Sequence, residues 1–157
     1  MSRKQRRTYA AWILLTEAVG ALSALLTRDG SRFYSASVVK PPLSPSAIVF
    51  PIVWTILFAL MGIGAARIAL SKPSVFRTRA LRLYFVQLAF NFLWSILFFN
   101  LRNFCGALIW LLALWGLILW MLLTFRRVER TAGHLQIPYL AWVSFAAYLN
   151  LGVCLLN

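Results

Sequence analysis

The uncharged run from Ile48 to Ala66 constrains this chain more than any other feature, because it holds 19 residues and not one charge. As a helix it rises about 1.5 Å per residue, which is enough to cross a hydrocarbon core of about 30 Å. Immediately before it, Pro41, Pro42 and Pro45 exclude a helix, since proline lacks a backbone donor and pushes the preceding residue toward extended conformations. The sequence therefore predicts a stiff, extended loop that leads directly into a transmembrane helix.

Apolar runs of similar length recur along the whole chain, separated by basic connectors. Charged residues make up only 12% of the 157 residues, against roughly 25% in soluble domains, so we exclude a water-soluble surface. The chain fits one domain, residues 1–157, and the runs predict an all-α integral membrane protein, a five-transmembrane-helix bundle. The predicted spans are residues 8–27, 48–66, 83–101, 104–125 and 135–157, and residues 28–47 form the longest loop.

The 16 lysines and arginines lie between the apolar runs. With five spans, twelve of them fall on the side of the amino terminus and four on the other side. The positive-inside rule then predicts a cytoplasmic amino terminus and an outward carboxyl terminus, with the loop 28–47 outside. Because no solvated basic face is present, the net charge of +13 indicates anionic membrane lipids as partners and excludes nucleic acid.

The basic head and the first apolar run also have the pattern of a signal peptide, but Glu17 interrupts the run, so we favour an uncleaved span. A carboxylate at mid-membrane costs about 2.5–3.5 kcal/mol, and such residues usually face the protein interior and are paired or functional. Glu17 is therefore a proton-coupled site or, as we favour, a protonated acid bonded to a neighbouring helix. Gly20 and Ala24 share its face and allow close helix approach.

Three predicted spans each carry one face that mixes aromatic with polar or small residues. Aromatic rings stack in offset contact with other π-systems, so these faces are candidates for lining a pocket for a flat ligand beneath the proline-rich loop. For the amides the alternative, which we favour, is that they join helices to one another. The faces are Trp54, Phe58, Met61 and Ala65; Gln87, Asn91, Trp94 and Ser95; and Tyr139, Trp142, Ala146, Leu149 and Asn150.

The chain has only two cysteines and one histidine, which limits metal binding and thiol chemistry. Cys105 and Cys154 both fall near the outer surface, where a disulfide is open to them, but thiols in membrane helices more often serve as packing residues, which is what we expect. His134 is the only histidine and lies in a connector, so we predict no metal site.

Taken together, the chain resembles the TspO/MBR family (tryptophan-rich sensory protein, translocator protein, peripheral-type benzodiazepine receptor) over nearly its whole length. Four sequence blocks in the same order carry the resemblance, and Glu17-Ala18-Val19-Gly20 adds to it. The blocks are Lys40-Pro41-Pro42-Leu43-Ser44-Pro45; Val49-Phe50-Pro51-Ile52-Val53-Trp54-Thr55; Gln87-Leu88-Ala89-Phe90-Asn91-Phe92-Leu93-Trp94 with Phe98-Phe99; and Pro138-Tyr139-Leu140-Ala141-Trp142 with Leu149-Asn150.

The resemblance implies a five-helix bundle, commonly a homodimer, that binds porphyrins, sterols and synthetic isoquinoline and benzodiazepine ligands in a pocket under the first loop. Some bacterial members degrade protoporphyrin in light, which depends on pocket tryptophans, and by position Trp54 and Trp142 resemble these catalytic residues. With the faces described above, the candidate ligand-binding residues are Trp54, Phe58, Gln87, Asn91, Trp94, Tyr139, Trp142, Ala146 and Leu149, and the lid residues are Lys40, Pro41, Pro42 and Pro45.

We therefore expect a binding protein for tetrapyrroles and similar hydrophobic ligands in the bacterial cytoplasmic membrane, with sensing, transport and photodegradation all open. Protoporphyrin IX or haem is the candidate ligand, no cofactor is bound obligatorily, and Arg32 and Lys40 are placed to meet ligand carboxylates. An alternative is a small proton-coupled exporter of hydrophobic cations that uses Glu17. A third is a structural scaffold or sensor subunit.

The chain departs from the family pattern at the end of the loop. The family usually continues with Pro-Gly-Trp after Pro45, whereas this chain has Ser46, Ala47 and Ile48. Phe58 stands where the family often has tyrosine. We expect these changes to loosen the end of the lid and to alter ligand preference.

Overall fold

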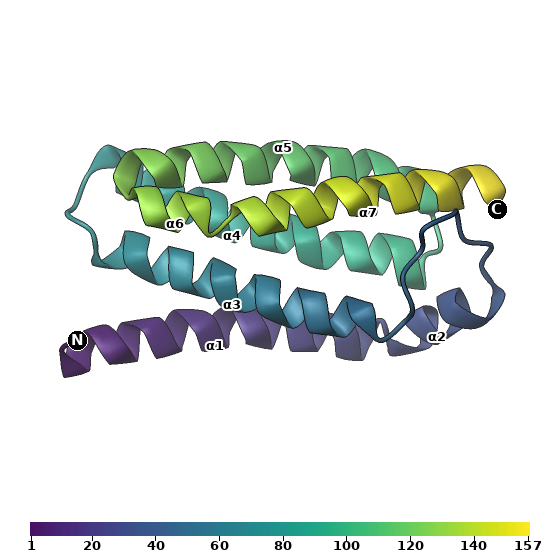
Figure 1. The fold of residues 1–157 in the computed structure, drawn as a ribbon, viewed down its shortest axis with the longest axis horizontal. Helices are drawn as coiled ribbons and strands as arrows, with labels where there is room; N and C mark the ends of the chain where they lie inside the picture. The colour runs from purple at the N-terminus through teal and green to yellow at the C-terminus, as the bar shows by residue number, and fades with distance from the viewer.

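Helices form nearly all of the computed structural model, which describes residues 1–157 (Figure 1). Five helical stretches are long and apolar enough to cross a membrane, which confirms the predicted all-α bundle of five spans. The elements are α1 (Arg3–Leu26), α2 (Arg28–Ser37), α3 (Val49–Leu70), α4 (Val75–Ser95), the π-helix η1 (Ile96–Asn100), α5 (Phe104–Val128), α6 (Arg130–His134) and α7 (Ile137–Leu156).

The helices run further into the basic connectors than the apolar runs indicate. Ser2 caps α1 in a capping box with Gln5, and the side chain of Ser74 accepts a hydrogen bond from the backbone N–H of Arg77 at the start of α4. Such caps satisfy backbone donors that would otherwise lack partners, and lysine and arginine are good helix formers. The connectors therefore extend the spans as helix, and the turns between them are shorter than predicted.

The prediction that residues 28–47 form a loop is wrong for the first half of the segment, which is the helix α2. Gly30 and the polar residues indicate a turn, but Gly30 lies inside the helix where the backbone of Phe99 approaches too closely for any side chain. Lys40 Nζ closes the end of α2 by donating to the carbonyl oxygens of Ser35 and Val38 at 3.1 and 3.3 Å. Only residues 38–47, here named the lid segment, are extended.

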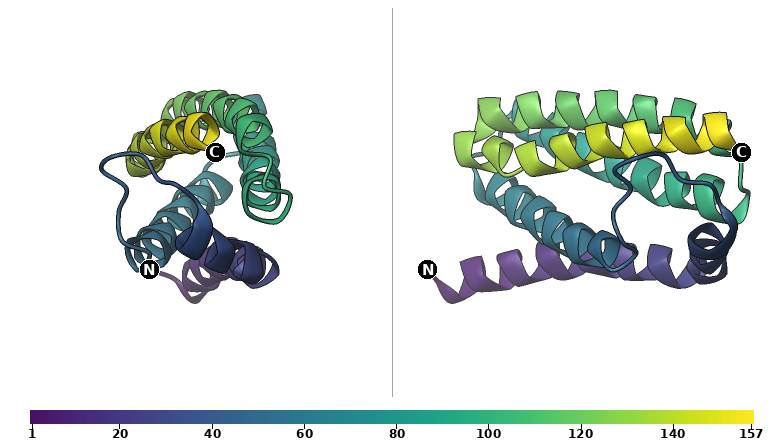
Figure 2. Two further views of the ribbon diagram at one scale, coloured as in Figure 1. Left: turned by 90° about the vertical axis from the view of Figure 1, so that its right-hand side faces the viewer. Right: turned by 45° about the vertical axis from the view of Figure 1, so that its right-hand side comes forward.

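The core lies between α3, α4, α5 and α7, with Met61, Tyr84, Ile118 and Val143 fully or almost fully buried. By contrast, α1 buries a single residue, Thr16, whose hydroxyl lies 2.6 Å from the Tyr84 hydroxyl. Figure 2 shows α1 lying along α3 at the outside of the bundle. The helix is therefore an outer wall, with most of its apolar surface turned away from the protein.

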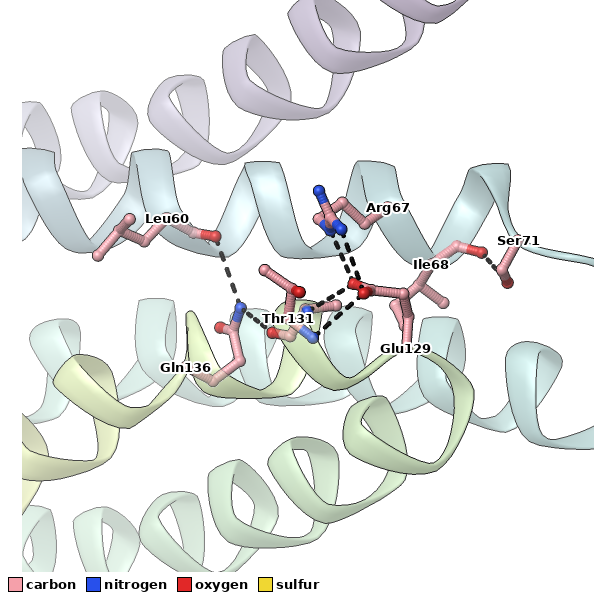
Figure 3. A network of polar contacts seen from close by, with 8 residues as sticks. Leu60, Arg67, Ile68, Ser71, Glu129, Thr131 and Gln136 are labelled. Carbon is pink, nitrogen blue, oxygen red and sulfur yellow. Dashed lines mark hydrogen bonds and ion pairs between the residues drawn. The ribbon is translucent and has the colours of Figure 1, made fainter.

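A polar network joins the bundle at the end where the amino terminus lies (Figure 3). Arg67 Nε donates to Glu129 Oε2 at 2.7 Å, and the same carboxylate accepts from the backbone N–H groups of Thr131 and Ala132 at the start of α6. These bonds stabilise the charged form and lower the pKa of Glu129 to about 2. Gln136 Nε2 donates to the carbonyl oxygen of Ala132 at 3.2 Å. The network thereby fixes the α5–α6–α7 corner against α3.

Cys105 and Cys154 form a disulfide with their Cα atoms 5.0 Å apart. The expectation of two packing thiols is therefore wrong. Helices α5 and α7 are antiparallel neighbours, so the first turn of one lies beside the last turn of the other. The bond ties these two helices at the same end of the bundle as the lid segment.

Candidate ligand-binding cavity

A cavity of about 620 Å³ opens at the lid end of the bundle. Its walls come from α1, α2, α3, α4, η1 and α7, and the lid segment contributes Lys40 and Pro45–Ala47. The volume lies within the range of about 300–1,000 Å³ that small-molecule sites occupy. Elements from both ends of the sequence thus enclose one space.

Most of the predicted site residues meet in this cavity. Gln87 and Tyr139 do not line it, because they lie fully buried behind its floor, and Pro41 and Pro42 face α7 instead. The predicted residues that do line it are Trp54, Phe58, Asn91, Trp94, Trp142, Ala146, Leu149, Lys40 and Pro45.

Aromatic side chains hold the cavity walls in place. Trp54 packs against Phe58 with ring centroids 5.5 Å apart, and Trp142 meets Phe50 edge to face at 6.0 Å. Such pairs contribute about 0.5–1.5 kcal/mol beyond the area they bury. Trp54 and Trp142 are half-buried and come from different helices, so each presents part of an indole to the same space.

The floor of the cavity is polar and internally hydrogen-bonded. Asn91 Nδ2 donates to the Tyr139 hydroxyl at 2.8 Å, and this hydroxyl donates to Gln87 Oε1 at 2.8 Å. Trp94 Nε1 donates to Asn150 Oδ1 at 3.1 Å, while Asn150 Nδ2 donates to the carbonyl oxygen of Phe104. The amides therefore join helices, as we favoured from the sequence, and Asn91 and Asn150 also line the cavity.

The lid segment is docked on the last turns of α7. Val39 and Asn157 exchange two hydrogen bonds of 3.0 and 2.9 Å, and the Tyr148 hydroxyl donates to the carbonyl oxygen of Pro42 at 2.8 Å. The Pro41 ring occupies the space above Gly152, where any side chain would collide with it. The segment is thus held at several points to one helix.

The cations that are available to a ligand at the rim of the cavity are not the pair that we predicted from the sequence. Lys40 Nζ is bonded to backbone carbonyls of the α2 end and lies 5.1 Å from the Tyr34 ring centroid, so its charge is already engaged. Arg32 is exposed, with Asp29 at 3.8 Å, and lines the cavity together with Arg28. The arginines of α2 are therefore the cations best placed to meet a bound anion.

Sequence reasoning missed the wall that α1 and α2 contribute. Ser23 lies 2.6 Å from Ser95 between their hydroxyl oxygens, and both residues line the cavity. The available signal was a stripe of small residues at helical spacing, of which we identified only Gly20 and Ala24 and interpreted them as a surface for close helix approach. This stripe comprises Gly20, Ser23, Ala24, Thr27 and Ser31.

Glu17 lies outside this arrangement. Its side chain is half-buried, makes no ion pair or hydrogen bond, and does not line the cavity. No group of three or more His, Cys, Asp or Glu side chains is placed to hold a metal ion.

A bundle of five apolar helices around one aromatic-walled cavity defines a membrane protein that binds hydrophobic ligands. The comparison with known proteins makes the class specific: the model of the TspO/MBR family matches residues 12–156, and the chain belongs to this family. It is accordingly an integral membrane protein.

Relatives from distant organisms match over most of their length. The tryptophan-rich protein TspO of Chlorobaculum tepidum is 38% identical over 98% of both chains. The tryptophan-rich sensory protein of Cereibacter sphaeroides is 36% identical over 95% of this chain and 92% of its own. The translocator protein of Bos taurus is 38% identical over 87% of this chain and 82% of its own.

Proposed function

We propose that the protein binds a tetrapyrrole, such as protoporphyrin IX or haem, in the cavity beneath the lid segment. The observation that carries this proposal is the convergence of Trp54 and Trp142, from two helices, on one space of about 620 Å³. A flat π-system placed there contacts indole surfaces in the offset geometry that aromatic groups prefer. Sensing, transport and light-driven breakdown of the ligand all begin from this bound state.

The charge at the rim supports an anionic ligand edge. Arg28 and Arg32 line the cavity at its α2 side, and guanidinium groups bind carboxylates through paired hydrogen bonds. The ring then lies toward the apolar interior while its carboxylates stay near water. In this arrangement Lys40 stays bonded to the carbonyl oxygens at the end of α2.

The first experiment is a titration of the detergent-solubilised protein with protoporphyrin IX in the dark, read by quenching of tryptophan fluorescence. We expect saturable quenching that weakens when Trp54 or Trp142 is replaced by phenylalanine. Trp120→Phe is the matched control, because Trp120 is 54% exposed and does not line the cavity. Quenching that never saturates, or that responds equally to all three substitutions, contradicts the proposal.

The same complex tests for catalysis when it is illuminated. If an indole donates an electron to the excited ring, bound porphyrin should bleach faster than free porphyrin, and Trp142→Phe should remove the difference. Unchanged bleaching in this variant excludes a catalytic role for Trp142.

We further propose that the lid end faces outward and the amino terminus faces the cytoplasm. The distribution of the cations supports this orientation through the positive-inside rule. The Cys105–Cys154 bond at the lid end supports it independently, since disulfides persist in oxidising compartments. A homodimer stays a prediction. For a proton-coupled exporter we find no favouring observation, because Glu17 lies outside the cavity.

A further inference from the structure

Behind the cavity, buried side chains form a chain of hydrogen bonds in which the donor and the acceptor of every bond are fixed. The backbone carbonyl of Tyr84 can only accept, so the Gln87 amide, 3.1 Å away, must turn its Nε2 toward it. Gln87 Oε1 is then left as an acceptor for the Tyr139 hydroxyl. Since that proton is given to Gln87, the Tyr139 oxygen can only accept from Asn91 Nδ2. A backbone carbonyl thus fixes the orientation of a side chain at the cavity floor.

The outcome at the cavity floor is one amide oxygen that is free to accept a hydrogen bond. Asn91 Oδ1 has no hydrogen-bond partner, and it is not among the buried unpaired atoms, so it is open to the cavity that Asn91 lines. Asn150, the other amide there, is already bonded through both its oxygen and its nitrogen. Gln87 and Tyr139 are fully buried, so solvent cannot rearrange the chain of bonds.

We infer that Asn91 determines ligand specificity by presenting its carbonyl oxygen, and that Tyr139 and Gln87 are the positioning residues that prevent the amide from turning over. The ligand class follows: a flat, apolar molecule with an O–H or N–H donor on the side that faces α4. This inference rests on the proposed function, because it assumes that the cavity is a binding site for a flat hydrophobic ligand.

A matched pair of probes tests the inference. The alcohol 1-(pyren-1-yl)ethanol and the ketone 1-acetylpyrene have the same heavy atoms in the same connectivity, but only the alcohol donates a hydrogen bond. Binding of either pyrene is read by energy transfer from the tryptophans of the cavity. Because one hydrogen bond contributes about 1 kcal/mol, we expect the wild-type protein to prefer the alcohol about fivefold.

Two substitutions should change this preference in different ways. In Tyr139→Phe the Asn91 amide loses its partner and can turn, so the ratio of the two affinities should fall to about one. In Gln87→Met the Tyr139 proton needs a new acceptor and should take Asn91 Oδ1, which turns Nδ2 toward the cavity. The preference should then reverse in favour of the ketone.

Tyr84→Phe is the control, because it removes a buried hydroxyl bonded to Thr16 but keeps the Tyr84 carbonyl that anchors the chain of bonds. Tyr84→Phe should leave the ratio of the affinities for the alcohol and the ketone unchanged. Comparing ratios between variants cancels the unequal partition of the two probes into detergent, and a loss of packing alone would weaken both probes alike.

A wild-type protein that binds the ketone as tightly as the alcohol overturns the inference, as does one that binds neither pyrene. A preference that Tyr139→Phe and Gln87→Met both leave intact also overturns it. If protoporphyrin IX fails to bind while the pyrene pair behaves as expected, the inference stands and the proposed tetrapyrrole is wrong.

Discussion

The carboxylate of Glu129 makes two stabilising interactions: it forms an ion pair with Arg67 of α3, and it caps the start of α6. Both groups are about one-third exposed or less, with side-chain exposures of 35% for Arg67 and 28% for Glu129. Exposed ion pairs contribute little, about 0–1 kcal/mol, whereas loss of a capping side chain costs about 0.5–2 kcal/mol. The pair here is bidentate, which is the stronger geometry, and Arg67 is the largest cause of the lowered pKa of Glu129, so the cap and the ion pair contribute comparably.

Glu129→Ala should lower the thermal midpoint of the solubilised protein, at a cost of about 1–2 kcal/mol from the cap and the ion pair together. The pKa of Glu129 falls from about 4.5 to about 2 on folding, so the stabilisation is complete above pH 4.5 and is lost as the pH falls toward 2. The difference between the thermal midpoints at pH 7 and pH 3 should therefore be smaller in Glu129→Ala than in the wild-type protein. Asp29→Ala serves as the control, because its ion pair with Arg32 is mostly exposed, with side-chain exposures of 97% and 66%.

The residues that sequence patterns could not place share a physical reason. Tyr139 and Gln87 stand on the predicted faces, but spacing cannot tell a residue that lines a cavity from one that lies one layer behind it. Lys40 is a free cation in the sequence, and its partners, the carbonyls at the end of α2, exist only once that helix has formed.

Among the elements, α2 and the lid segment act together, since Lys40 closes the first and begins the proline-rich part of the second. The lid segment in turn depends on α7 through the pair of bonds between Val39 and Asn157. Leu43, in the middle of the lid segment, has a φ of 68°, which is strained for a residue with a side chain, and it is 81% exposed, so no burial of its side chain compensates for the strain.

Asn157→Ala should loosen the lid segment, which Tyr148 and the contact of Pro41 with Gly152 still hold, without changing the helices that line the cavity. Two hydrogen bonds of about 1 kcal/mol each are lost, and we expect the dissociation rate of bound porphyrin to rise about fivefold or more. Stopped-flow recovery of tryptophan fluorescence measures this rate. Leu155→Ala changes an exposed side chain on the same turn and should leave the rate as it is. Equal rates in both variants would show that the two bonds between Val39 and Asn157 do not help to retain the ligand.

At the scale of the whole molecule, the five spans were predictable because uncharged runs of this length have few alternatives in a membrane protein. Helix α2 was not, because its apolar residues are few and its stability comes from Tyr34 and Gly30 packing on η1. The disulfide was not predictable either, because two cysteines near one surface give no information on the distance between their helices.

The disulfide should stabilise the bundle as a whole. Removing a bond between residues 49 positions apart costs about 2–4 kcal/mol in the chain-entropy picture. We expect the thermal midpoint of the wild-type protein to fall when reductant is added, and the double variant Cys105→Ser, Cys154→Ser to melt at the lower value with or without it. A midpoint that is indifferent to reductant in the wild type would contradict this prediction.

The docking of the lid segment on α7 also sets an order of events during synthesis. Val39 and its partner Asn157 are 118 positions apart in the sequence. At about 5–20 residues per second, the ribosome takes about 6–24 s to deliver the second partner after the first. During this interval the lid segment lacks its contacts with the end of α7, so the cavity of the nascent protein is open to the lipid and to any ligand dissolved there. In the finished protein the contacts with α7 hold the lid segment in place, so a ligand acquired during synthesis should exchange more slowly afterwards.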